Sequence, residues 1–235
     1  MFVERYYTQT EDTFSFSREQ ASDFAKSIAG DFNPIHDPDN KRFCVPGDLL
    51  FSLTLSKYGV SKAMSFNFQG MVGSDTPVHF VEEGSQVSIQ NEKEKTFLTV
   101  DRTGDVSVNE AFIEGLIRSY VAFSGKTFPH ILVELMEEEG MMLNAERPMV
   151  IYDLMKIEFT SFAETAPEVV LQSKRFDVDG KRGMVIMNFD IQADGKSIGS
   201  GEKHIIMSGL RPYEQSGIDM LVNNYEEAKA RYFEN

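Results

Sequence analysis

The sequence sets out the same order of elements twice. Each half begins with an amphipathic helix, continues through a G-x-x-x-P turn into an apolar helix, and ends in a run of strand-like segments. The two turns are Gly30-Asp31-Phe32-Asn33-Pro34 and Gly125-Lys126-Thr127-Phe128-Pro129. Because a repeat in the order of elements predicts two similar structural units, we expect an α+β chain. Each half should wrap an antiparallel sheet around a central apolar helix.

The first half, residues 1–106, opens with a short helix and a polar turn. Ser17 and Gln20 form a capping box, and Gly30 supplies the end of the helix. Residues Asp48–Tyr58 are rich in leucine, which predicts a buried helix. Short strands are predicted at Ser65–Gln69, Val78–Val81, Gln86–Ile89 and Phe97–Val100.

The second half, residues 107–212, repeats this order with longer strands. Asn109 caps a predicted helix that Gly125 closes, and Lys126–Met136 is predicted to form the apolar helix. The predicted strands are Met155–Phe162, Val169–Val178, Met184–Ile191 and Ser197–Met207. The turns between the last three contain Asp-Gly pairs, which are typical of hairpins. Residues 213–235 predict a terminal helix that docks through one apolar side.

Charge and composition narrow the class of function. The net charge is −14, with 37 acidic and 23 basic side chains. This balance argues against a nucleic-acid partner, because such a protein needs a basic face to neutralise phosphates, and against an anionic membrane surface. No apolar run approaches the roughly 20 residues that span a bilayer, and the first residues lack the order of a signal peptide. The lone Cys44 forms no internal disulfide, so we expect a cytoplasmic protein.

The stretch A-G-D-F-N-P-I-H contains more than a turn needs. Gly30 permits a sharp exit from the helix, the following proline stiffens the loop, and Asn33 fixes its shape through the side-chain amide. Asp31 and His36 therefore lie on a loop with little freedom to move. A carboxylate and an imidazole held close together can share one water, remove its proton and supply a proton to a carbon. This chemistry serves the addition of water to a polarised double bond.

Simpler interpretations of the same residues stay open. Gly, Asp, Asn and Pro are common in turns, so the loop can also be a solvated helix end. We interpret the acidic run His36-Asp37-Pro38-Asp39-Asn40 as a solvated turn and not as a metal site, because no second His or Cys cluster lies near it. Cys44, in an apolar stretch, is interpreted as a small buried side chain.

The pattern G-D-x-N-P-x-H resembles the hydratase motif of the MaoC-like, (R)-specific enoyl-CoA hydratases. Those proteins have a hotdog fold, in which an antiparallel sheet wraps a long helix. A motif-bearing half followed by a degenerate half is similar to their double-hotdog members. The resemblance implies an N-terminal hotdog over 1–106, a degenerate hotdog over 107–212 and a C-terminal helix over 213–235. The segments R-F-C-V-P-G-D-L-L-F and S-G-L-R-P-Y also resemble a bacterial family without an assigned activity.

The resemblance implies a role for several residues. Asp31 and His36 would be the catalytic pair that activates water for an enoyl or 3-hydroxyacyl thioester of the CoA type. Asn33 would support the loop, and the Gly47 N–H would polarise the thioester carbonyl at a helix N-terminus. No metal and no redox cofactor is expected. The family usually carries Met after this glycine, so Asp48 predicts a carboxylate near the oxyanion site.

The remaining expectations concern the substrate, the second half and the partners. Lys41 and Arg42 follow the motif closely and would meet the phosphates of a CoA-type substrate. Lys126 stands where Asp31 stands in the first half, so we expect no second hydratase centre. A non-catalytic hotdog module that binds an acyl thioester or a protein, and a thioesterase, remain alternatives. The fused halves would form a pseudo-dimer within the chain, and a further homodimer stays open.

Overall fold

One antiparallel sheet organises the fold. The computed structural model describes residues 1–234, and in them ten strands pair in the order β1-β2-β4-β5-β6-β3-β8-β11-β10-β9. In the first half the strands are β1 (Thr8–Thr10), β2 (Thr13–Ser15), β3 (Val60–Phe68), β4 (Val78–Glu83), β5 (Gln86–Asn91) and β6 (Thr96–Ser107). The later strands are β8 (Val150–Phe159), β9 (Glu168–Asp179), β10 (Arg182–Ala193) and β11 (Lys196–Ser208). A separate small sheet pairs β7 (Met141–Met142) with β12 (Arg211–Pro212).

The two halves of the large sheet have the same strand order. Counted outward from the middle, the first half runs β3, β6, β5, β4 and the second runs β8, β11, β10, β9. In each of these two sets of four, the first strand in sequence is innermost and is followed outward by the fourth, third and second, and β2 and β1 extend the first set beyond β4. The innermost strands β3 and β8 pair directly, with Ala63 opposite Glu158 and Asn67 opposite Leu154. Hydrogen bonds therefore join the two halves into one continuous sheet.

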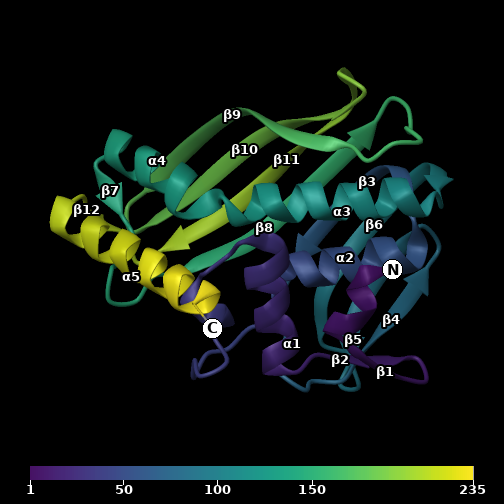
Figure 1. Ribbon diagram of the computed structural model, residues 1–235, viewed down its shortest axis with the longest axis horizontal. Coiled ribbons are helices and arrows are strands. Elements are labelled where there is room, and N and C mark those ends of the chain that lie inside the picture. The colour runs from purple at the N-terminus through teal and green to yellow at the C-terminus, as the bar shows by residue number, and fades with distance from the viewer. Residues whose placement is uncertain (235) are drawn as a thin grey trace.

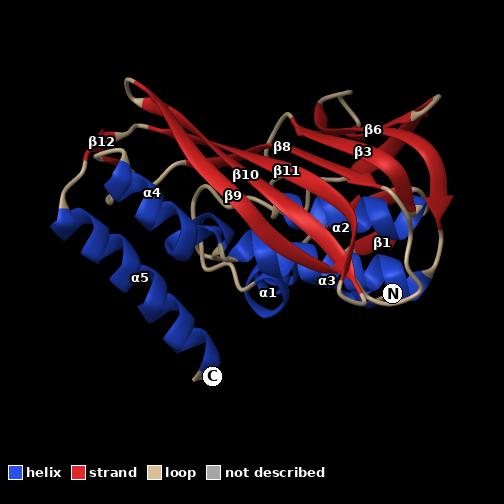
Figure 2. Ribbon diagram, turned by 90° about the horizontal axis from the view of Figure 1, so that it is seen from above, coloured by secondary structure: helices blue, strands red, loops and turns tan. Residues whose placement is uncertain are grey.

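The α-helices gather on one face of this sheet (Figures 1 and 2). They are α1 (Arg18–Asp23), α2 (Gly47–Tyr58), α3 (Glu110–Gly125), α4 (Leu132–Glu138) and α5 (Gln215–Phe233). A π-helix, η2 (Phe24–Ala29), continues α1, and short turns occur at η1 (Phe2–Tyr6), η3 (Pro34–His36) and η4 (Thr127–Ile131). Because α2 is apolar on almost every side, it is buried between the sheet and the other helices, and α3 packs against α2, η2 and β9.

Most of the predicted elements are confirmed. Each predicted strand corresponds to one of β3 to β6 or β8 to β11, and most of these are longer than predicted. Ser17 accepts a hydrogen bond from the Gln20 N–H in the predicted capping box, and Asn109 caps α3 by accepting one from Phe112. The terminal helix α5 docks through one apolar side, on which Leu221 and Tyr225 are buried.

The prediction of an apolar helix over Lys126–Met136 is wrong in its first turn. The α-helix begins only at Leu132, and Phe128 is extended, with φ −117° and ψ 137°. The physical reason is Pro129, because a proline disfavours the helical conformation in the residue before it. The resulting helix α4 is short, so the long helix against the second half of the sheet is α3 (Figure 1).

Candidate active site

The predicted site residues meet at one cavity of about 1020 Å³. Its wall includes the loop that carries the sequence motif (residues 29–36, the motif loop), the start of α2 and the end of α3. Parts of β3, β8, β11 and α5 complete it. All six of the residues predicted from the sequence line it: Asp31, Asn33, His36, Lys41, Arg42 and Gly47. The cavity therefore draws on both halves of the chain, although the motif belongs to the first half alone.

The motif loop leaves the helix through a glycine in the left-handed region. Gly30 has φ +68°, and the Asp31 N–H donates to the Ala25 carbonyl over 2.8 Å. The turn then closes on its own side chains, because Asp31 Oδ1 accepts the Asn33 N–H at 2.8 Å and Asn33 Oδ1 accepts the Ile35 N–H at 3.2 Å. Asn33 thus fixes the shape of the loop, as side-chain caps of this kind do. Asp31 keeps its second oxygen free of this turn.

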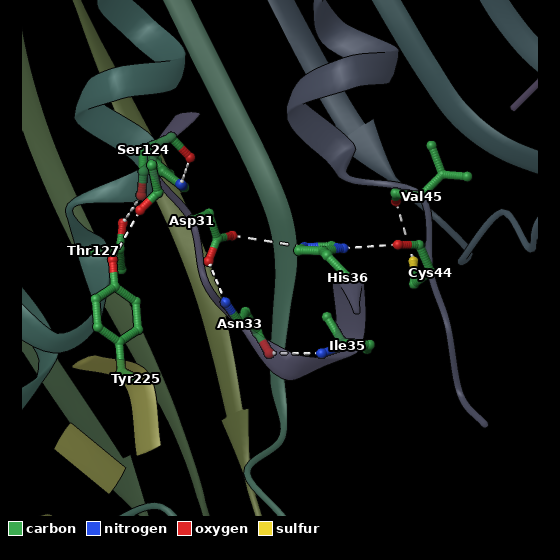
Figure 3. A network of polar contacts seen from close by, with 11 residues as sticks. Asp31, Asn33, Ile35, His36, Cys44, Val45, Ser124, Thr127 and Tyr225 are labelled. Atoms are coloured by element: carbon green, nitrogen blue, oxygen red, sulfur yellow. Dashed lines mark hydrogen bonds and ion pairs between the residues drawn. The ribbon is translucent and has the colours of Figure 1, made fainter. Parts of the chain in front are cut away.

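That second oxygen faces the imidazole of His36. Asp31 Oδ2 lies 3.6 Å from His36 Nε2, and His36 Nδ1 lies 2.7 Å from the Cys44 carbonyl (Figure 3). A carbonyl oxygen only accepts, so Nδ1 carries the proton. In the neutral ring, Nε2 then presents its lone pair towards the carboxylate. Two acceptors at this separation can each take one hydrogen of a single bridging water, which is the arrangement needed to activate it.

The end of α3 presses directly on the motif loop. A Cβ on Gly125 would lie 1.8 Å from the Ala29 carbonyl oxygen and 3.3 Å from the Asp31 nitrogen. No side chain fits at that distance, so the glycine allows two backbones to touch. The second half of the chain therefore sets the position of the motif loop in the first.

The C-terminal helix also holds the loop. The Tyr225 hydroxyl of α5 donates to the Gly30 carbonyl over 2.8 Å. Its ring packs edge-on against Phe32, which is buried in the middle of the motif, and against Phe128. The hydrogen bond joins residues that are nearly 200 positions apart in the sequence, and sequence patterns gave no sign of it.

Gly47 begins α2 at the edge of the cavity, after Pro46 as the N-cap residue. A Cβ at Gly47 would lie 3.0 Å from the ring of Phe68 and 3.1 Å from that of Tyr152, which stack on each other at 4.2 Å. The glycine therefore lets the helix N-terminus approach this aromatic wall. The N–H groups of Leu49 and Leu50 donate to the Pro46 carbonyl. Those of Gly47 and Asp48, at the very start of α2, have no acceptor within the helix and are suited to polarise a carbonyl.

A second set of polar residues lines the same cavity: Asp48, Ser124 and Lys203, referred to below as the polar cluster. Lys203 is only 3% exposed, and its Nζ donates to Ser124 Oγ and lies 4.3 Å above the Tyr152 ring. Asp48 is 7% exposed, and its Oδ1 has no hydrogen-bond partner among the described residues. The three side chains come from α2, α3 and β11, so they meet only in the folded chain.

Burial governs the protonation of the polar cluster. It raises the pKa of the Asp48 carboxyl, although the Lys203 charge and a hydrogen bond with Ser124 act in the opposite direction. Burial also lowers the pKa of the Lys203 ammonium against the attraction of Asp48 and Asp31. Both shifts favour the uncharged forms, because a buried charge loses its hydration. The raised pKa of Asp48 therefore reduces the negative charge expected near the oxyanion site, and where Asp48 is ionised the Lys203 ammonium offsets that charge.

Sequence reasoning placed Asp48 near the site but missed Lys203 and Ser124. The signal for Lys203 was present, because Lys203, Ile205 and Met207 alternate along β11 and all three are buried. Side chains two residues apart share one face of a strand, so a lysine in phase with buried apolar residues points inward. Ser124 carried no comparable signal.

The other candidate residues are not part of the Asp31–His36 pair. Burial raises the pKa of the Cys44 thiol to about 12, so it is a poor nucleophile, and its carbonyl is what contacts His36. Lys41 and Arg42 line the cavity and are exposed to solvent, as are Lys95 and Arg147.

No group of three or more metal-binding side chains occurs in residues 1–234. None of the helices described is long and apolar enough to cross a membrane.

The fold and the site define an α+β protein in which two sets of four strands with equal topology cover long helices, and β2 and β1 extend the first set; this arrangement fits a hotdog fold. The chain belongs to the family described as "Protein of unknown function (DUF3581)", whose model matches residues 1–216. No curated protein matches it by sequence.

Solved structures with a similar course of the chain are distant. A protein of unknown function with a hot dog fold from Alicyclobacillus acidocaldarius has a TM-score of 0.48 and 10% identity, covering 91% of this chain and 99% of its own. An acyl-CoA thioesterase II from Mycobacterium marinum has a TM-score of 0.44 and 11% sequence identity, and the match covers 91% of this chain and 100% of that protein. A MaoC-like dehydratase has a TM-score of 0.43 and 9% sequence identity, and the match covers 86% of this chain and 97% of that protein. Similarities at this level assign no activity to this chain.

Proposed function

We propose that the chain is a hydratase or dehydratase that acts on an enoyl or 3-hydroxyacyl thioester. The observation that carries this proposal is the pairing of Asp31 Oδ2 with His36 Nε2 at 3.6 Å. The Cys44 carbonyl fixes the imidazole so that Nε2 is the basic nitrogen. Both groups line a cavity that also contains the free N-terminus of α2.

The reaction follows from these positions. A water held between Asp31 and His36 adds its oxygen to the β-carbon of the enoyl group, while the pair takes up one of its protons. The π electrons of the double bond move onto the thioester carbonyl and form an enolate, which the Gly47 N–H stabilises. The pair then returns a proton to the α-carbon, so the overall change is the addition of one water. Dehydration is the same path in reverse.

The substrate carrier in this proposal is coenzyme A or a similar phosphate-bearing thiol. Exposed cations that line the cavity support it: Lys41, Arg42, Lys95 and Arg147. Their local positive charge offsets the acidic net charge of the chain where phosphates would lie. Asp31, His36 and the cations belong to the first half except for Arg147, in keeping with a double hotdog whose second half supports the site without a centre of its own.

The test is the hydration of crotonyl-CoA by Asp31→Asn, followed by the loss of enoyl-thioester absorbance. Removal of a general acid or base costs roughly 100-fold to 10,000-fold in rate, and asparagine keeps the size of the side chain. Lys126→Asn, at the corresponding position of the second half, is the matched control and should keep the wild-type rate. Equal rates in wild type and Asp31→Asn would refute the proposal.

Thioester hydrolysis is the second candidate, because the same activated water can attack the carbonyl carbon in place of the β-carbon. The geometry of Asp31 and His36 serves both reactions. Release of free thiol from a saturated acyl-CoA, lost in Asp31→Asn, would identify a thioesterase. Binding of acyl-CoA without either reaction would identify a non-catalytic module.

A further inference from the structure

The polar cluster lines the cavity that, in the proposed function, receives the acyl chain of the thioester, and a purely aliphatic chain would not pair with its polar groups. Lys203 and Asp48 are both more than nine-tenths buried and both line the cavity beside the catalytic pair. One oxygen of Asp48 has no partner among the described residues. Buried polar groups are costly when unpaired, and a purely apolar ligand against them would leave that cost in place.

Contacts within the protein use only some of the hydrogen-bonding groups of the polar cluster. Lys203 donates to Ser124 and lies over Tyr152, which uses one of the three N–H groups and one face of the ammonium. Ser124 accepts a hydrogen bond from Lys203, and its hydroxyl also acts to lower the pKa of Asp48, so it links the two ionisable groups. What remains is a set of N–H donors on Lys203 and a buried acceptor, Asp48 Oδ1, that has no partner among the described residues. The two therefore offer a donor and an acceptor on the cavity wall.

We infer that the polar cluster recognises an oxygen-bearing group on the acyl part of the thioester. A hydroxyl group fits best, since it accepts from Lys203 and donates to Asp48 Oδ1. A carboxylate shares the accepting chemistry and is accommodated when Asp48 holds a proton. This inference rests on the proposed function, and it defines the substrate class as thioesters whose acyl part carries a hydroxyl or carboxylate group.

The test compares saturated thioesters, which have no double bond to hydrate. The panel is butyryl-, 4-hydroxybutyryl- and succinyl-CoA, with hexanoyl-, 6-hydroxyhexanoyl- and adipoyl-CoA as a longer series. Calorimetric dissociation constants are measured with Asp31→Asn, which suppresses turnover. A hydrogen bond to a charged group corresponds to about tenfold or more in affinity. We expect at least one oxygen-bearing ligand to bind that much more tightly than its apolar counterpart.

Variants show whether the polar cluster is responsible. Ser124→Ala and Lys203→Met should reduce the preference for the oxygen-bearing ligand, and Ser124→Ala serves if Lys203→Met fails to fold. Lys156→Met is the matched control, because Lys156 is an exposed lysine on the neighbouring strand β8 that pairs with Glu202. It should leave the preference unchanged.

The outcomes separate this inference from the proposed function. Equal or tighter binding of butyryl- and hexanoyl-CoA would overturn the inference, whatever the hydration assay shows. A preference that survives both Ser124→Ala and Lys203→Met would overturn it as well. An oxygen preference that depends on Lys203, in a chain that hydrates neither crotonyl-CoA nor 4-hydroxycrotonyl-CoA, would sustain the inference and refute the hydratase.

Discussion

The motif loop and its counterpart in the second half share a sequence pattern but do different work. Gly30 bends into the left-handed region, after which Asp31 faces His36. Gly125 stays helical at the end of α3, and the next residue, Lys126, is exposed to solvent. The second turn has no counterpart of Asp31 or His36, yet its glycine touches the first turn and the preceding Ser124 joins the polar cluster. A repeat can therefore lack a site of its own and still build its neighbour's.

The largest expected effect concerns the polar cluster, to which the second half contributes two of the three side chains. Lys203→Met leaves the buried Asp48 without its cation and should lower the free energy of unfolding by roughly 3 to 5 kcal/mol. The double variant with Asp48→Asn should recover part of this loss, as urea unfolding can measure. A double variant that loses the full sum of both single effects would contradict the coupling of the two residues.

The same variant predicts a pH dependence of stability. Without Lys203, the folded state holds the Asp48 proton to a higher pH than the unfolded state, whose pKa is about 3.9. The folded state then binds more protons than the unfolded state, so its stability falls as the pH rises through this window. We expect the loss caused by Lys203→Met to be larger at about pH 8 than at about pH 5. A loss independent of pH would show that the two groups do not interact.

The next effect compares the two glycines of the repeat directly. Gly125→Ala places a Cβ 1.8 Å from the Ala29 carbonyl and should destabilise the fold by about 3 kcal/mol, the upper range for overpacking. Gly30→Ala meets no atom within 4 Å and costs only the left-handed dihedral, about 1 to 2 kcal/mol. Urea unfolding of both variants gives the comparison. A larger loss for Gly30→Ala would show that backbone conformation, and not close approach, dominates at this contact.

The smallest effect tests the support of the motif loop from α5. Tyr225→Phe removes the hydrogen bond to the Gly30 carbonyl but keeps the ring against Phe32, so the loss of unfolding free energy should be about 1 kcal/mol. Tyr213→Phe is the control, since the Tyr213 hydroxyl donates to Gln215, two residues away in the sequence. Equal losses of unfolding free energy in the two variants would show that the Tyr225 hydrogen bond does not support the motif loop.

Much of the fold could be predicted because its signals are local. Capping at Ser17 and Asn109, the apolar run of α2 and the hairpin turns between the later strands each depend on a few neighbouring residues. The prediction failed at Lys126–Met136, because the apolar pattern is helical in period while Pro129 keeps the preceding Phe128 out of the helical conformation. The site was predictable to the extent that it lies on one loop, and so the sequence pointed to Asp31 and His36 but not to Lys203.

By itself the sequence determined how the motif loop is shaped and which side chains it carries, because a glycine, a proline and an asparagine restrict the backbone wherever the loop is placed. Only the tertiary structure decided what the loop faces. The contacts of Gly125 with Ala29, of Tyr225 with Gly30 and of Lys203 with Ser124 join positions far apart in the chain. Such contacts depend on how the two halves of one sheet bring their helices together, which no local pattern of residues specifies.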